Sequence, residues 1–289
     1  MRRLPGILAA ALAAAILAAP AAAEAPTRIV VAGGDLTEIV HALGGGERIV
    51  GVDTTSLHPA AVTELPQIGY VRALAPEGVL SLRPDLLIGA ADAGPADALI
   101  KLRAAGLRVE IAPNVEGADS VPAKIGFVGE ILGLEAEAEA LSVTYAAEMK
   151  ELAEIVAGIA SRPKVLFILA MQGNGPLVAG DETAAGAMIA LAGADNAATG
   201  FEGYKPMSRE AVLAAAPDVV LMMDDRLDTF GGPDAILALP EIAPTPAGRN
   251  GRLVTMDGLL LLGFGPRTPE AVRQLAVELH PEDGGQLAR

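Results

Sequence analysis

The sequence predicts an α/β protein made of two similar βα lobes, joined by a long backbone helix, with a ligand cleft between the lobes. Two observations support this fold class. Short aliphatic strands alternate with helical segments through short connections, which is typical of a mostly parallel sheet covered on both faces. The same pattern also occurs twice in the 289 residues, once on each side of a proline-poor helical stretch.

In the first half, apolar runs and helical spacing alternate from residue 28 onward. Strands are expected at 28–32, 48–52, 85–89 and 109–111, and helices at 36–43, 76–82 and 96–105. Glycines follow several of the expected helices, as in Gly44-Gly45-Gly46, where they mark helix ends.

The alternation restarts at residue 164. Strands are expected at 165–169, 218–222 and 252–256, helices at 184–191 and 269–279, and a glycine-rich loop at 173–180. The segment between the halves, 119–160, is rich in Ala, Glu, Leu and Ile, and we interpret it as helical with an interruption near Gly133.

An internal repeat relates the two halves. Three residue pairs recur with an offset of 133: Glu77 and Glu210, Pro84 and Pro217, Asp85 and Asp218. Tyr70 and Tyr204 differ by 134, one position from that register. We therefore divide the chain into a signal peptide (1–23), an N-terminal lobe (24–117), a linking helix (118–160) and a C-terminal lobe (161–289).

The N-terminus has the pattern of a secretory signal peptide. Met1-Arg2-Arg3 is followed by an apolar stretch over 4–19 and by Ala21-Ala22-Ala23, a basic region, an apolar region and a cleavage site. An N-terminal membrane anchor is the alternative, but the apolar run is short for a span of about 20 residues. The chain has no cysteine, so it carries neither a lipidated cysteine nor a disulfide. These features predict a soluble bacterial periplasmic protein without membrane insertion.

Charge and motif content exclude several functional classes. The formal net charge is −15, and cleavage of the signal peptide would remove Arg2 and Arg3 and leave −17, so we expect no nucleic acid partner. The sequence contains neither G-x-S-x-G nor a glycine loop with a Walker A lysine. We therefore expect a binding protein and not an enzyme.

Tyr70 is the most informative candidate, because the chain has only three tyrosines and no tryptophan. It lies in Gly69-Tyr70-Val71-Arg72, a turn sequence with an arginine two residues on. A nearby guanidinium favours the phenolate form, and a phenolate is one of the few protein groups that ligate ferric haem. An ordinary surface tyrosine is the alternative. Since Tyr204 belongs to the equivalent connection of the second lobe, we expect both tyrosines to face the cleft as ligand contacts.

Glu77 and Glu210 are each expected in the first turn of a short helix. Favourable placement against the helix dipole would explain both. A symmetric pair of exposed carboxylates that docks onto a two-fold partner is the other interpretation, and the residues alone leave both open.

The block from Gly69 to Leu82, together with Tyr204-Lys205-Pro206-Met207-Ser208 and the terminal Gly263-Phe264-Gly265-Pro266-Arg267, resembles the haem-binding periplasmic proteins of bacterial haem-uptake ABC transporters, which belong to the helical-backbone, cobalamin/siderophore-type binding proteins. The resemblance implies haem b as the transported ligand. It implies that Tyr70 is the axial iron ligand, that Arg72 polarises the phenolate or contacts a propionate, and that Arg226 is a second cleft arginine. It also implies that Glu77 and Glu210 dock on the permease dimer of an importer driven by its own ATPase.

The resemblance also bears on the sixth iron ligand. Some relatives use a histidine after the first strand of the second lobe, but here that position reads Ala170-Met171-Gln172-Gly173. We predict five-coordinate iron held by Tyr70 alone, with Met171 and His58 as the alternatives for a sixth ligand. We expect a monomer. A ferric-siderophore or cobalamin carrier of the same fold is the alternative function.

Overall fold

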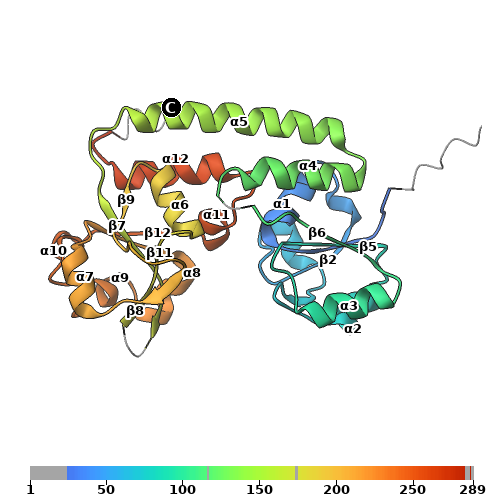
Figure 1. Cartoon of the computed structure of the whole chain (residues 1–289), viewed down its shortest axis with the longest axis horizontal. Helices are drawn as coiled ribbons and strands as arrows, with labels where there is room; N and C mark the ends of the chain where they lie inside the picture. The colour runs from blue at the N-terminus through green and yellow to red at the C-terminus, as the bar shows by residue number, and fades with distance from the viewer. Residues whose placement is uncertain (1–24, 116, 173–174, 284–286, 288–289) are drawn as a thin grey trace, which may run out of the picture.

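The computed structural model describes residues 25–115, 117–172, 175–283 and 287, so the expected signal peptide lies outside the described residues. Two α/β lobes lie next to each other, and helix α5 (Glu135–Ala157) runs along one side of both (Figure 1). The predicted fold class of two βα lobes with a backbone helix is confirmed.

The N-terminal lobe is built on a parallel four-stranded sheet in the order β2-β1-β5-β6. Strands β1 (Ile29–Ala32) and β5 (Leu86–Gly89) are fully buried, as expected for central parallel strands with helices on both faces. The other elements of this lobe are β2 (Ile49–Val52), β3 (Gly69–Tyr70), β4 (Ala73–Leu74), β6 (Arg108–Ile111), α1 (Gly34–Ala42), α2 (Pro76–Ser81), α3 (Ala96–Ala104), and the 3₁₀ helices η1 (Gly46–Arg48) and η2 (Ala60–Glu64).

The C-terminal lobe repeats the same strand order. Strand β7 (Lys164–Gln172) pairs in parallel with β9 (Asp195–Asn196) on one side and with β11 (Val219–Met223) on the other, and β12 (Leu253–Met256) follows β11. The helical elements of this lobe are α6 (Ala184–Leu191), α7 (Arg209–Ala215), α8 (Asp224–Leu227), η3 (Asp228–Phe230), α9 (Pro233–Leu237), α10 (Pro246–Asn250), α11 (Gly258–Leu262) and α12 (Thr268–Leu279).

Matching hydrogen bonds confirm the internal repeat. In the first lobe, the Asp85 carboxylate accepts hydrogen bonds from the backbone amides of Thr27, at 2.8 Å, and Arg28, at 3.1 Å. In the second lobe, the Asp218 carboxylate accepts one from the backbone amide of Lys164, at 2.9 Å. Asp85 thus links the start of β5 to the start of β1, and Asp218 links the start of β11 to the start of β7.

The expectation of a glycine-rich loop over 173–180 is wrong from Gly175 to Ala179, and residues 173–174 lie outside the described residues. Residues Gly175–Ala179 form strand β8, which pairs antiparallel with the end of β7 and with β10 (Tyr204–Pro206). Gly175 and Pro176 are residue types that are common in turns and rare in strands. For this reason the start of β8 was interpreted as part of a loop. The apolar Leu177-Val178-Ala179 that follows was the signal for it.

The linking segment consists of two helices. Helix α4 (Ser120–Leu132) ends at Gly133, whose φ of 67° is left-handed, and α5 begins two residues later. The two helices cross closely at Gly129, where an added Cβ would lie 2.4 Å from the Cβ of Ala138. Only glycine permits this approach, so Gly129 sets the angle at which α5 leaves the N-terminal lobe.

One apolar core extends through both lobes under the helices α4, α5 and α12. It contains Leu36 and Ile39 of α1, Ile125 of α4, Leu152 of α5 and Leu275 of α12, all at most 1 % exposed. Separate clusters fill the outer face of each sheet. The shared core means that the lobes are packed together along the helical side of the molecule.

One ion pair and one lysine hydrogen bond join the lobes beside this core. The Lys124 ammonium of α4 contacts Asp35 of α1 at 2.7 Å and donates to the Phe264 carbonyl of the C-terminal lobe at 2.8 Å. Arg267, just before α12, donates to Glu38 of α1. Burial raises the pKa of Glu38, and Arg267 opposes that rise. Helix α1 is therefore the element through which the N-terminal lobe contacts the C-terminal lobe by charge.

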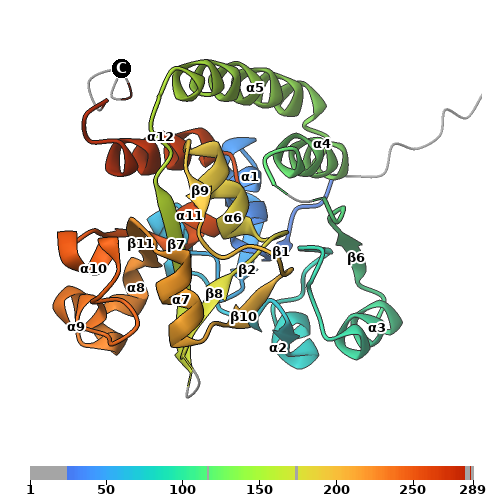
Figure 2. The same cartoon turned by 60° about the vertical axis from the view of Figure 1, so that its left-hand side comes forward.

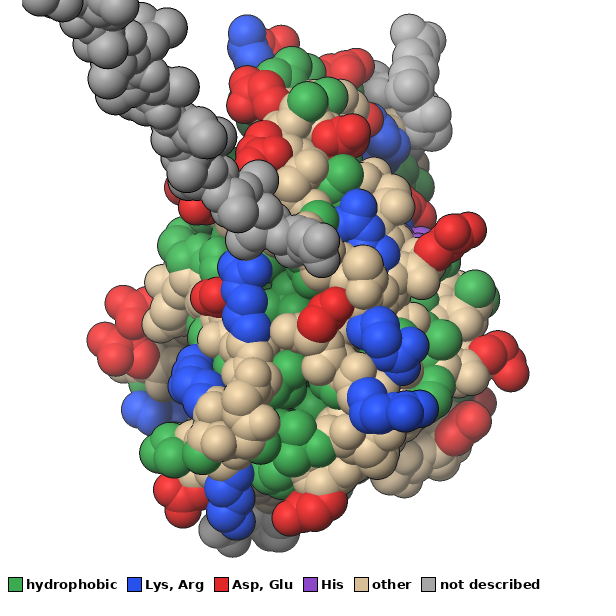
Figure 3. Space-filling view, turned by 90° about the vertical axis from the view of Figure 1, so that its right-hand side faces the viewer, with side chains coloured by type: hydrophobic (Ala, Val, Ile, Leu, Met, Phe, Trp, Pro, Cys, Tyr) green, Lys and Arg blue, Asp and Glu red, His purple; other side chains and the backbone are tan. Residues whose placement is uncertain are grey.

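The outer end of the N-terminal lobe carries charges of both signs. In Figure 3 the described Lys, Arg, Asp and Glu side chains of this face are interspersed among apolar ones.

Candidate functional site

A small hairpin presents Tyr70 at the surface of the N-terminal lobe. Strands β3 and β4 pair antiparallel, Tyr70 opposite Ala73, and the loop between them is Val71-Arg72. Gly69 has a φ of 96°, a backbone conformation that residues with a side chain rarely adopt. The buried Val71 and Leu74 anchor the hairpin in the lobe, while 42 % of Tyr70 is exposed. The sequence thus forms a rigid support with an accessible phenol.

Arg72 contacts Tyr70 directly. Its Nη1 donates a hydrogen bond to the Tyr70 Oη at 3.0 Å, and its Cζ lies 5.8 Å from the centre of the Tyr70 ring. Its Nε donates to the Asp92 carboxylate at 2.6 Å. The hydrogen bond with Asp92 is the main cause that raises the pKa of Arg72. A permanent cation is therefore placed on the phenol oxygen.

Tyr204 lies on β10 in the C-terminal lobe and is half-buried. Its ring packs edge-to-face on Phe167, with centroids 6.4 Å apart and an interplanar angle of 66°. Burial raises the pKa of Tyr204, while the backbone amide of Ala185 and the charge of Arg72 act in the opposite direction. The charge of Arg72, in the N-terminal lobe, thus acts on the phenol of Tyr204 in the C-terminal lobe.

Arg226 lies on the short helix α8, directly after β11, on the side of the C-terminal lobe that is drawn toward the N-terminal lobe in Figure 1. Its side chain is about half exposed and its Nε is 3.5 Å from the Asp225 carboxylate, its neighbour in the chain. Nothing in the described residues joins Arg226 to Tyr70 or Arg72, so it stands apart from their hydrogen-bonded pair.

Glu77 and Glu210 are both exposed in the first turn of their helices, α2 and α7. Both helices lie on the side of their lobe that faces away from α5 (Figures 1 and 2). The Ser208 hydroxyl caps α7 by accepting from the Ala211 amide at 3.3 Å. The backbone amide of Glu210 and the Ser208 hydroxyl lower the pKa of Glu210, which is ionised at neutral pH.

The two alternative iron ligands lie in other surroundings. Met171 of β7 packs with Phe201 and Met207 against the outer apolar cluster of the C-terminal lobe, whereas Tyr204 packs against the cluster shared by the lobes. His58 is exposed, and its charge acts on Glu38 and His41 of α1. Among the described residues, the hydrogen bonds and ion pairs of Tyr70 and Arg72 include neither side chain.

Asp92 is a residue of the site that the sequence reasoning missed. It lies in the connection from β5 to α3, just beyond the carboxyl end of a central parallel strand. Ligand-binding groups of open α/β sheets gather at that edge. A single aspartate three residues after a buried Leu-Leu-Ile-Gly strand was the signal that could have indicated it.

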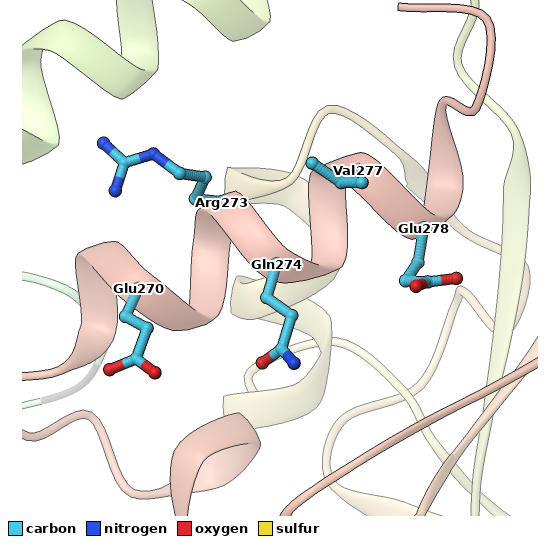
Figure 4. Close-up of a pocket in the computed structure, with 5 residues that line it drawn as sticks. All are labelled: Glu270, Arg273, Gln274, Val277 and Glu278. Carbon is cyan, nitrogen blue, oxygen red and sulfur yellow. The ribbon is translucent and has the colours of Figure 1, made fainter. Parts of the chain in front are cut away.

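Two surface depressions lie elsewhere. One, of about 370 Å³, is lined by Glu270, Arg273, Gln274, Val277 and Glu278 of α12. Figure 4 shows that these side chains diverge from the helix and do not converge on one point. The other, of about 460 Å³, lies at the end of the C-terminal lobe, where Ser161, Asp218 and Arg252 are among the lining residues. Neither includes a residue of the predicted site.

Two further findings concern the described part of the chain. No three His, Cys, Asp or Glu side chains within it are grouped so that they could hold a metal ion. None of its helices is both long enough and apolar enough to cross a membrane.

Comparison with solved structures gives matches over about nine tenths of the chain. The chain is 45 % identical to the periplasmic heme-binding protein BhuT in complex with two hemes, over 90 % of this chain and 98 % of that one, with a TM-score of 0.83. It is 42 % identical to the apo form of the periplasmic heme-binding protein RhuT from Roseiflexus sp. RS-1, over 89 % and 98 %, with a TM-score of 0.85. A periplasmic heme-binding protein from Pseudomonas aeruginosa is 41 % identical over 89 % and 93 %, with a TM-score of 0.82.

Curated sequences give more distant matches. An uncharacterized ABC transporter substrate-binding lipoprotein, YvrC of Bacillus subtilis, is 27 % identical over 89 % of this chain and 81 % of its own length. The vitamin B12-binding protein of Pectobacterium carotovorum is 23 % identical over 88 % of each chain. The profile of the family described as periplasmic binding protein matches residues 29–259, which include the strands of both lobes and the helices between the lobes. The chain therefore belongs to the periplasmic binding protein family.

Proposed function

We propose that this protein binds haem in the periplasm and delivers it to an inner-membrane ABC importer. The observation that carries the proposal is the Tyr70–Arg72 pair, an accessible phenol that accepts a hydrogen bond from a fixed guanidinium at 3.0 Å. The solved structures that are 41–45 % identical to the chain are named as heme-binding proteins, which supports haem as the cargo. A binding role without catalysis agrees with the family.

Tyr70 would ligate the ferric iron through its phenolate oxygen. A hydrogen bond from a cation is stronger to an anionic oxygen than to a neutral one, so the Arg72 Nη1 stabilises the ligating form of Tyr70. The half-buried Tyr204 would contact the porphyrin from the opposite lobe. Arg226, exposed on α8, would pair with a haem propionate.

The iron would be five-coordinate, with Tyr70 as its protein ligand. Met171 packs in the outer apolar cluster of the C-terminal lobe, and thioether sulfur is a soft ligand that matches a ferric phenolate centre poorly. His58 lies near enough to α1 to act on the pKa of Glu38 and of His41. Both observations support ligation by Tyr70 alone.

The importer would recognise Glu77 and Glu210. Their positions on α2 and α7, one on each lobe and both on the side away from α5, support contact with the two halves of a permease dimer (Figure 2). The energy for transport would come from the ATPase of the importer. The protein would act as a monomer, released into the periplasm by cleavage after Ala23.

A cobalamin or ferric-siderophore carrier is the competing function. Curated relatives named vitamin B12-binding proteins are 23 % identical over most of the chain, well below the identity to the heme-binding structures. Titration of the purified protein with haemin, cyanocobalamin and a ferric siderophore separates these cargoes. Haemin is expected to bind far more tightly than the other two.

The Tyr70→Phe variant tests the site. Loss of the phenolate is expected to weaken haemin binding at least tenfold, as loss of metal-site groups typically does. Tyr145→Phe is the matched control, because Tyr145 is buried in α5 and donates to the Ala118 carbonyl at 3.0 Å, far from the hairpin in the chain. Equal haemin affinity in the Tyr70→Phe variant and the wild type would contradict the assignment.

A further inference from the structure

We propose that Asp92 is a positioning residue for haem binding, which holds the Arg72 guanidinium so that its Nη1 faces the Tyr70 oxygen. The inference rests on the proposed function, because it assigns Asp92 a role in the same site. The supporting geometry is that two of the three guanidinium nitrogens of Arg72 contact Asp92 and the third contacts Tyr70.

One carboxylate oxygen takes two of those nitrogens. The Asp92 Oδ2 is 2.6 Å from the Arg72 Nε and 2.5 Å from its Nη2, while Nη1 donates to Tyr70 at 3.0 Å. A guanidinium is planar, so two contacts on one edge fix the direction of the third nitrogen. Without Asp92, the Arg72 side chain could rotate away from Tyr70 into solvent.

The backbone carries Asp92 and Arg72 on one rigid unit. The Leu74 amide donates to the Gly94 carbonyl at 2.8 Å, and the Gly94 amide donates to the Val71 carbonyl at 2.9 Å. The connection that holds Asp92 is thus hydrogen-bonded to the hairpin on both sides of Arg72. At its start, the Ala90 amide donates to the Ala32 carbonyl of the central strand β1 at 2.8 Å.

Folding stability does not explain the pair. The side chains of Arg72 and Asp92 are 62 % and 46 % exposed. Ion pairs this exposed contribute little to stability, because water and salt screen them and two long side chains lose rotational freedom. The Arg72–Asp92 pair contributes little to stability, yet it leaves the Arg72 Nη1 directed at the Tyr70 oxygen. This arrangement indicates that Asp92 orients Arg72.

Simple electrostatics predicts the opposite result for a variant of Asp92. The carboxylate repels both a phenolate and the propionates of haem, so removing its charge would by itself strengthen haem binding. A positioning role predicts that removing it weakens binding, because the hydrogen bond from Arg72 to Tyr70 is lost. The direction of the change in affinity therefore decides between the two.

The test measures haemin affinity and the ferric tyrosinate spectrum of Asp92→Ala, Asp92→Asn and Asp92→Glu. We expect Asp92→Ala to weaken binding about tenfold, a size of effect known for coupled contacting residues. A weaker tyrosinate signature is expected with it. Asp92→Asn, which keeps an acceptor oxygen, should fall between Asp92→Ala and the wild type, and Asp92→Glu should restore most of the affinity. Asp97→Asn, an exposed aspartate in the first turn of α3, is the charge-matched control.

A double-mutant cycle with Arg72→Ala completes the test. If Asp92 acts through Arg72, then Asp92→Ala has no further effect when Arg72 is already alanine. Tighter binding by Asp92→Ala, unchanged binding, or the same loss in the Arg72→Ala background would overturn the inference. Thermal unfolding checks that each variant is folded. Absence of haemin binding by the wild type would refute the proposed function itself, and the two failures are thereby distinguished.

Discussion

Tyr70, Tyr145 and Tyr204 are three tyrosines with three different environments. Tyr70 is exposed beside a cation, Tyr204 is half-buried and packs on Phe167, and Tyr145 is 5 % exposed under the helices. Burial is the largest cause that raises the pKa of Tyr145, to about 12. The Tyr145 hydroxyl donates to the Ala118 carbonyl at 3.0 Å and therefore ties α5 to the start of α4. Its role is structural, whereas Tyr70 is the proposed ligand contact.

The raised pKa of Tyr145 predicts how the free energy of unfolding depends on pH. The folded state holds the phenol proton more tightly than the unfolded chain, so the contribution is fully present below pH 10 and is lost as pH rises toward 12. A shift of about 2 units corresponds to about 2 to 3 kcal/mol. Denaturant unfolding at a series of pH values should show that the stability advantage of the wild type over Tyr145→Phe shrinks in this window. Parallel pH profiles for the two proteins would contradict the prediction.

Among the elements, α1 and α4 determine how the lobes meet. Lys124 of α4 contacts Asp35 of α1 and the Phe264 carbonyl of the second lobe, and its side chain is only 10 % exposed. A buried cation with two partners on different lobes cannot be removed without leaving both unpaired. The packing of the two lobes at this contact therefore depends on the Lys124 side chain.

Lys124→Met keeps the length of the side chain and removes its charge. We expect the free energy of unfolding to fall by about 2 to 4 kcal/mol, because Asp35 stays largely buried without its partner. Lys101→Met, an exposed lysine in the last turn of α3, is the control, with an expected change within about 0.5 kcal/mol. Equal unfolding midpoints for the two variants would show that the Lys124 contacts contribute no stability.

Most of these elements could be predicted from the sequence, because aliphatic strands and helical spacing leave clear periodic patterns. Strand β8 could not, since Gly175 and Pro176 resemble a loop and the strand is short. Tyr70 and Arg72 were predicted because they are neighbours in one motif. Asp92 was not, because the contact spans 20 positions and depends on how the connection after β5 folds back on the hairpin. Contacts of that kind depend on the fold and leave no mark in local sequence.

In the whole molecule, the helical side and the opposite side have different roles. The shared apolar core and the helices α4, α5 and α12 hold the lobes together on one side. Helices α2 and α7 present Glu77 and Glu210 on the other (Figure 1). The internal repeat explains why equivalent carboxylates appear on both lobes, and a two-fold partner is the surface that such a pair would match.

Reversal of both charges tests the docking role. The double variant Glu77→Arg and Glu210→Arg should bind haemin with the wild-type affinity, because neither residue is hydrogen-bonded or ion-paired to Tyr70 or Arg72. Its stimulation of the importer ATPase in liposomes should fall at least about tenfold, since like charges at an interface repel. Glu137→Arg with Glu151→Arg, two exposed residues of α5, makes the same change in net charge on the opposite side. Equal loss of stimulation in both double variants would rule out a specific docking surface.

The central claim is that Tyr70 holds the haem iron, and the absorption spectrum of the protein with one equivalent of ferric haemin tests it most directly. A high-spin ferric tyrosinate spectrum is expected for the wild type and for Tyr145→Phe, and it should be absent in Tyr70→Phe. A low-spin spectrum in the wild type, or a tyrosinate spectrum that survives in Tyr70→Phe, would show that another group ligates the iron and would contradict the account.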